Sequence, residues 1–209
     1  MQTNSKNGFT LIEMAFVMLI VGLLVTLGIE TLPLMIKQNK LSENKAIVKD
    51  AKTAIIGYVK ANGRLPFAAA TANGNPTNAT YRGYLPYATL GMSRNDSAGR
   101  VLRYAVDGEL TQTTSANIVS RLSTLISNPA SRAANRPAQN CRSYPTGGPN
   151  TPVAFVVFSE GENGAINAPN AVAGNNAFEA PEAPLIDPYD DILAAPTLVY
   201  LLGVLSVTP

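Results

Sequence analysis

Apolar residues are concentrated near the start of the chain, in an almost unbroken run. From Phe9 to Ile29 the sequence reads FTLIEMAFVMLIVGLLVTLGI, and Glu13 is the only charged residue in it. A helix of about 20 apolar residues is long enough to cross a bilayer. The pattern therefore predicts a membrane-spanning helix over residues 9–30, preceded by a short polar segment, residues 1–8.

The pattern beyond this run predicts that the helix continues as an amphipathic half over residues 31–62. Apolar residues recur there at intervals of seven, which keeps them on one helical face. Asn62 and Gly63 are typical of a helix end, with Pro66 shortly beyond. Pro33 lacks the amide hydrogen of the helix ladder, so we expect it to kink or loosen the helix. The recurring apolar residues are Leu34, Leu41, Val48 and Ile55.

Three lysines, Lys45, Lys49 and Lys52, share another face of the predicted amphipathic half. A row of like charges on a helix is usually a solvated surface, and a ligand-binding role is the alternative. We interpret the row as a solvated face.

Residues 63–209 differ in composition from the helix and predict a globular head with a small sheet. Strand formers alternate over residues 101–107, and a shorter apolar segment covers residues 191–194. A continuous apolar run over residues 153–158 predicts the central strand. The predicted fold class is therefore α+β, with a long N-terminal helix packed on a small antiparallel β-sheet.

The rest of the head predicts two short helices and a long irregular segment. Apolar residues at helical spacing predict a surface helix over residues 117–127. Pro196 suits the first turn of a C-terminal helix that ends near Leu205. Residues 129–152 are expected to be mostly loop.

The composition excludes several classes of chemistry. The chain has no histidine, so histidine-based triads and histidine-containing zinc sites are absent, and we expect no enzyme. Cys141 is the only cysteine, which excludes an intrachain disulfide. Charged residues make up 14% of the chain and the net charge is +2, so we expect no nucleic-acid partner.

The segment Gly8-Phe9-Thr10-Leu11-Ile12-Glu13 resembles the class III leader of type IV pilins and type II secretion pseudopilins. In that family a prepilin peptidase cuts after the glycine and methylates the new N-terminal phenylalanine. The resemblance implies cleavage between Gly8 and Phe9, N-methylation of Phe9, and Glu13 as the fifth residue of the mature chain. It makes the predicted fold pilin-like, with residues 1–8 a cleaved leader peptide and residues 9–30 the assembly half of the helix.

Glu13 has two interpretations. The resemblance implies that its carboxylate meets the α-ammonium of Phe9 in a neighbouring subunit during assembly. The alternative is a capping box, because Thr10 and Glu13 have the spacing of that motif at a helix start. We favour the assembly role, since a capping box does not explain the preceding glycine and phenylalanine.

A second resemblance concerns the turn after the central strand and the later Asp-Ile pair. In type II secretion major pseudopilins the corresponding loop binds calcium, an ion that prefers several hard oxygen ligands. The matching positions are Asn163 and Asp191, with Glu162 and Asp190 as nearby oxygen donors. Calcium is therefore a possible cofactor, and the alternative is a polar turn in which Asp190 caps nearby amides.

Together these features predict a structural subunit of a type IV pilus-like or type II secretion pseudopilus filament, assembled through its N-terminal helix. The alternative is a minor pilin that binds a surface, DNA or a secreted substrate through its head. The expected partners are prepilin peptidase, other pilin or pseudopilin subunits, the inner-membrane assembly platform and, before assembly, the membrane. The expected location is a single-pass inner-membrane protein with a periplasmic head, and then a periplasmic or extracellular filament.

Overall fold

The structure is a computed structural model. In it the chain forms two compact units, Met1–Leu41 and Ser42–Pro209. We call these the N-terminal unit and the C-terminal unit. Helix α1, Leu11–Asn62, passes through both. The residues described are 9–112, 117–132, 137–142, 149–171, 177–186 and 189–207.

Helix α1 begins and ends at residues that favour helix termini. Its last turn closes when the amide of Gly63 donates to the carbonyl of Val59 at 2.8 Å. Gly63 has a φ of +66°, the left-handed conformation that commonly ends a helix. The predicted end at Asn62 and Gly63 is therefore confirmed. Pro33 lies inside α1, and the helix continues through it without interruption.

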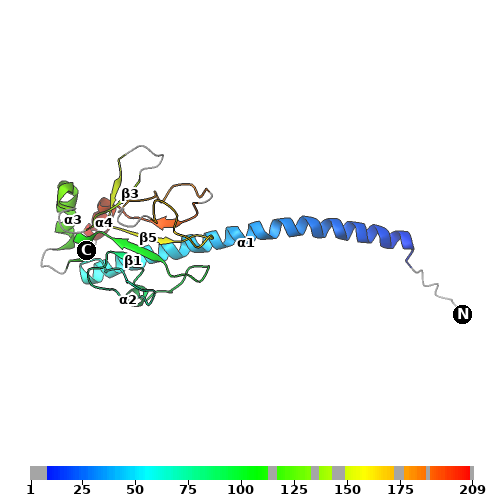
Figure 1. The fold of residues 1–209 in the computed structure, drawn as a ribbon, viewed down its shortest axis with the longest axis horizontal. Helices are drawn as coiled ribbons and strands as arrows, with labels where there is room; N and C mark the ends of the chain where they lie inside the picture. Colours follow the sequence, from blue (N-terminus) through cyan, green and yellow to red (C-terminus); the bar gives the residue numbers. More distant parts are fainter. Residues whose placement is uncertain are drawn as a thin grey trace. The chain divides into compact units, whose positions relative to one another are not determined.

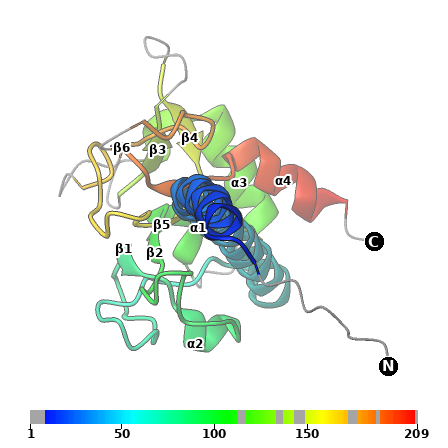
Figure 2. The same cartoon turned by 90° about the vertical axis from the view of Figure 1, so that its right-hand side faces the viewer.

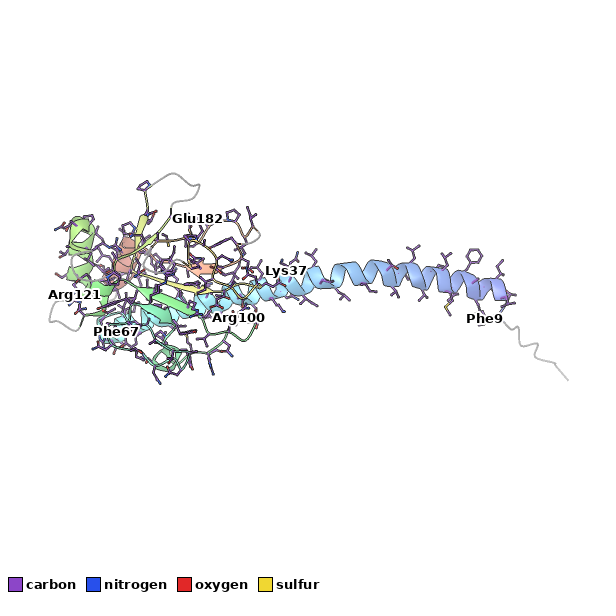
Figure 3. The ribbon with its side chains drawn as sticks, viewed as in Figure 1. Phe9, Lys37, Phe67, Arg100, Arg121 and Glu182 are labelled. Atoms are coloured by element: carbon purple, nitrogen blue, oxygen red, sulfur yellow. The ribbon has the colours of Figure 1, made fainter. Side chains whose placement is uncertain are left out.

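The N-terminal unit presents apolar side chains along its whole helical surface. Every side chain described between Phe9 and Lys40 is exposed. Phe9 is 83% and Leu11 is 93% exposed. Figure 3 shows these side chains projecting from α1, with Phe9 near its start. The membrane-spanning part of the fold prediction is not confirmed, because no helix among the described residues combines the length and apolarity that a bilayer crossing needs.

The amphipathic half of α1 buries one face in the C-terminal unit. Val48 and Ile55, two members of the seven-residue series, are buried together with residues one turn away. Leu34 is exposed and Leu41 is half-buried, so burial begins later along the helix than the series predicts. The buried apolar residues of this face are Val48, Ala51, Ile55, Ile56 and Val59.

The main sheet has four antiparallel strands in the order β1-β2-β5-β7 (Figure 1). Strand β5 is interior and buried at every position, as expected for the continuous apolar run. Strands β1 and β7 are the edges, and β7 pairs with β5 so that Leu193 lies opposite Phe158. The bounds are Arg82–Tyr84 for β1, Arg103–Val106 for β2, Phe155–Ser159 for β5 and Ile192–Ala194 for β7.

A second, three-stranded sheet in the order β4-β3-β6 is absent from the sequence prediction. Strand β3 pairs antiparallel with β4 and parallel with β6. The expectation that residues 129–152 are mostly loop was wrong for β3 and β4. These strands are three residues long and contain polar residues and a proline, so they carry no strand pattern. The bounds are Gln139–Cys141 for β3, Thr151–Val153 for β4 and Ala177–Phe178 for β6.

The two sheets share an apolar core. The rings of Phe158 on β5 and Phe178 on β6 lie 5.9 Å apart in a tilted arrangement. Cys141 and Val153 pack into the same buried cluster. Because Cys141 is buried, its thiol is desolvated, and the pKa rises to about 12. The only cysteine of the chain is therefore a core residue in its protonated form.

Helices α3, Ile118–Ser127, and α4, Leu198–Ser206, each begin with a side-chain cap. Asn117 accepts from the amide of Val119 at the start of α3. Thr197 accepts from the amide of Tyr200 at the start of α4, so Pro196 precedes the cap instead of lying in the first turn. Helices α3 and α4 lie side by side in Figure 2. The other short helices are α2, Tyr87–Leu90, and the 3₁₀ turns Gly108–Thr111 and Pro129–Arg132.

A buried ion pair joins the end of β2 to the second sheet. Asp107 is fully buried and Arg132 is 4% exposed. The Nη2 and Nε atoms of Arg132 lie 2.9 and 3.1 Å from Asp107 Oδ2. Nη2 also donates to the carbonyl of Gln139 at 2.7 Å, and Nη1 donates to Asn140 Oδ1 at 3.1 Å. The guanidinium thus satisfies acceptors from both sheets, as a buried charge requires.

Candidate functional site

The start of α1 forms a complete capping box. The amide and the hydroxyl of Thr10 both donate to Glu13 Oε2 at 2.9 Å. The amide of Glu13 donates in return to Thr10 Oγ1 at 3.3 Å. These reciprocal bonds satisfy amide hydrogens that a helix start otherwise leaves without a partner. The capping alternative for Glu13 is therefore present in the structure.

The capping bonds of Glu13 are compatible with a second role for its carboxylate. Its side chain is exposed, and Glu13 is the only carboxylate among the exposed, mainly apolar side chains from Leu11 to Val25. A carboxylate beside uncovered apolar residues favours a partner surface that is apolar and carries a cation. Of the two residues at the predicted cleavage position, Phe9 is exposed and Gly8 lies outside the described residues.

The predicted calcium residues meet at one turn, where they are engaged by hydrogen bonds. Asp190 Oδ2 accepts from the amides of Glu162 and Asn163 at 2.7 and 2.8 Å. Asn163 Oδ1 accepts from the amide of Ala165 at 2.8 Å. Asp191 Oδ2 accepts from the amide of Asn167 at 3.0 Å. The turn alternative, in which Asp190 caps nearby amides, is therefore realised.

Two oxygens at this turn have no hydrogen-bond partner among the described residues, namely Asp190 Oδ1 and Asp191 Oδ1, and both are buried. Burial raises the pKa of Asp191 to about 6, although the Asn170 side chain and the Asn167 amide favour its charged form. Within the described ranges, no three side chains from His, Cys, Asp or Glu are placed to hold a metal ion. Calcium prefers six or more oxygens, so its binding here stays a prediction.

A guanidinium already lies against the same turn. Arg100, labelled in Figure 3, donates from Nη2 to the carbonyl of Gly161. Its Nε lies 3.6 Å from Asp96 Oδ2, and the same Asp96 oxygen accepts from the hydroxyl of Ser159 at 2.8 Å. Arg100 thus connects the loop before β2 to the turn after β5. The sequence analysis missed this residue because no local motif relates positions 61 residues apart.

Replacing Gly161 with alanine is expected to destabilise the C-terminal unit by about 2 kcal/mol or more, because two costs add. Gly161 has a φ of +66°, and a Cβ there would collide with the carboxyl group and the carbonyl of Asp190. Gly99→Ala is the matched control, because Gly99 has a φ of +80° and open space around it. The measurement is chemical unfolding followed by near-ultraviolet circular dichroism of tyrosine. Equal losses in both variants would contradict the packing of Asp190 against Gly161.

Residues 3–29 match the family described as the prokaryotic N-terminal methylation motif. This motif is that of the class III prepilin leader of type IV pilins and pseudopilins, together with the apolar segment that follows it. No curated protein and no solved structure matches the chain. The match covers the leader and the first part of α1, so it identifies the N-terminal segment and indicates a type IV pilin-like protein.

Proposed function

We propose that this chain is a structural subunit of a type IV pilus-like or type II secretion pseudopilus filament. In this proposal prepilin peptidase cuts between Gly8 and Phe9 and methylates the new amine. Glu13 then meets the N-terminal amine of a neighbouring subunit, and the apolar half of α1 packs among copies of itself. The inner-membrane assembly platform brings the subunits together.

The observation that carries the proposal is the exposed apolar surface of α1 directly behind the prepilin motif. All described side chains from Leu11 to Val25 are exposed, and Glu13 is the one charged residue among them. Contiguous apolar surface of this extent marks an interaction site. A bundle of parallel copies covers such a surface, and it offers the carboxylate a cation when each copy begins at Phe9.

The leader also supports the order of events. A prepilin-type leader implies a membrane-anchored precursor followed by filament assembly. We therefore propose a single-pass inner-membrane precursor whose C-terminal unit lies in the periplasm. Assembly then places the subunit in a periplasmic or extracellular filament.

Processing has a direct test. In a host with its own prepilin peptidase, intact-mass and N-terminal peptide spectrometry are expected to find a mature chain that begins at N-methylated Phe9. A host that lacks the peptidase serves as control and should yield the chain from Met1. An intact Met1 in the peptidase-containing host would overturn the proposal.

A further inference from the structure

A groove of about 480 Å³ runs along the buried flank of α1 in the C-terminal unit. One wall is formed by Lys45, Lys49 and Lys52 of α1. The edge strand β7, the residues that lead into α4, and Tyr200 also line the groove. In the part of the chain that the structure describes, no Asp or Glu lines the groove. Lys45 and Lys49 are exposed, as predicted for a solvated face, and the lysine row also borders this groove.

The lysines of the groove form no ion pair with a carboxylate among the described residues. Neither Lys45 nor Lys49 forms an ion pair with any residue in the described part of the chain. Lys52 lies over the ring of Tyr200, with its Nζ 4.3 Å from the ring centroid. Three ammonium groups that lie beside apolar residues, with no ion pair to the described carboxylates, favour an acidic partner.

A matching acidic row lies on the same helix and faces away from the core. Glu43 and Asp50 are exposed, and neither has an ion-pair partner among the described residues. At 3.6 residues per turn, this row lies roughly 140° around α1 from the lysine row. The seven-residue interval from Glu43 to Asp50 equals that from Lys45 to Lys52, about 10.5 Å along the helix.

The helical face that carries Glu43 and Asp50 also has small residues, which allow another helix or strand to approach closely. Gly57 lies on this face in the interior of α1, exposed, with open space where a Cβ would be. A glycine inside a helix costs stability relative to alanine, and no described atom of the C-terminal unit crowds the position so as to require one. Ala46 and Thr53, which are also small and exposed, lie near it on the helical surface.

We infer that the groove receives the Glu43–Asp50 face of α1 from a second copy of this chain. The inference rests on the proposed filament function and names one of its contacts. Glu43 and Asp50 of one subunit pair with the lysine row of the next. Because the two surfaces differ and lie on different flanks of one helix, the contact is head-to-tail. Contacts of this kind propagate into open assemblies instead of closing into a symmetric dimer.

Charge reversal on each face provides the test, using the full chain in its assembling host. Lys45→Glu with Lys49→Glu, and separately Glu43→Lys with Asp50→Lys, are each expected to lower filament yield about tenfold or more. Co-expression of the two double variants is expected to restore filaments, because each variant then offers the face that the other lacks. The fourfold charge swap in one chain is expected to restore them as well. Lys60→Glu, on the same helix outside the groove, is the matched control.

The outcomes separate this contact from the function that it rests on. Wild-type filaments together with normal yields from both double variants would overturn the contact and leave the filament function standing. Loss in both variants without restoration, although the monomers accumulate and melt like wild type, would also overturn it and point to another acidic partner. If wild-type chains are neither processed nor assembled, the filament function is wrong, and the contact proposed within the filament is wrong with it.

Discussion

Replacing Glu13 with glutamine is expected to lower filament yield by about two orders of magnitude, as loss of one partner of a desolvated charge pair does. Glutamine preserves the capping box, because its side-chain oxygen can still accept from Thr10. It removes the negative charge that would meet the N-terminal amine of a neighbouring subunit. The measurement is the amount of assembled subunit in sheared filament fractions, normalised to processed monomer.

Thr10→Ala separates the capping role from the assembly role. This variant loses the hydroxyl that bonds to Glu13 Oε2 and to the Glu13 amide, and it keeps the carboxylate. Loss of a cap weakens the first helical turn modestly, so Thr10→Ala should still assemble. If Glu13→Gln assembles normally and Thr10→Ala does not, Glu13 acts only as a cap and the pairing proposal is wrong.

Local patterns account for the parts of the fold that sequence analysis predicted correctly. The end of α1 at Asn62, the interior strand β5 and the short helix α3 are confirmed within a residue or two. Each depends on neighbouring residues: a glycine in the left-handed conformation, a continuous apolar run, and an asparagine cap. The C-terminal helix was also predicted, although its cap is Thr197 and not a proline in the first turn.

The second sheet could not be predicted because it depends on contacts between distant segments. Strand β6 has two residues, and its parallel pairing with β3 joins Cys141 to Phe178. No pattern of alternation can show in so short a segment. The buried pair Asp107 and Arg132 is similarly hidden, since 25 residues separate them and neither stands in a motif.

The same contrast between local patterns and distant contacts applies to the candidate site residues. The prepilin motif is local, so the sequence alone predicts roles for Phe9 and Glu13, and the matched segment includes both positions. The four calcium candidates do come together at one turn, but their residue types fit a hydrogen-bonded turn as well as a metal site. The partnerless oxygens Asp190 Oδ1 and Asp191 Oδ1 emerge only from the packing around them.

Breaking the ion pair between Asp107 and Arg132 is expected to cost about 3–5 kcal/mol of unfolding free energy, because one charge then stays buried without its partner. Asp107→Asn tests this with little change in shape, since the amide oxygen can still accept from the Glu109 backbone at the 3₁₀ turn. Unfolding in urea, followed by near-ultraviolet circular dichroism of tyrosine, reports on the C-terminal unit. All eight tyrosines lie at or after Tyr58.

The double variant Asp107→Asn with Arg132→Met distinguishes a buried charge from a favourable pair. Replacing both charges leaves neither residue buried without its partner. Removing both charges should therefore cost less than removing Asp107's charge alone. Losses that add across the two single variants would show instead that each residue contributes independently, with no coupling energy between the two charges.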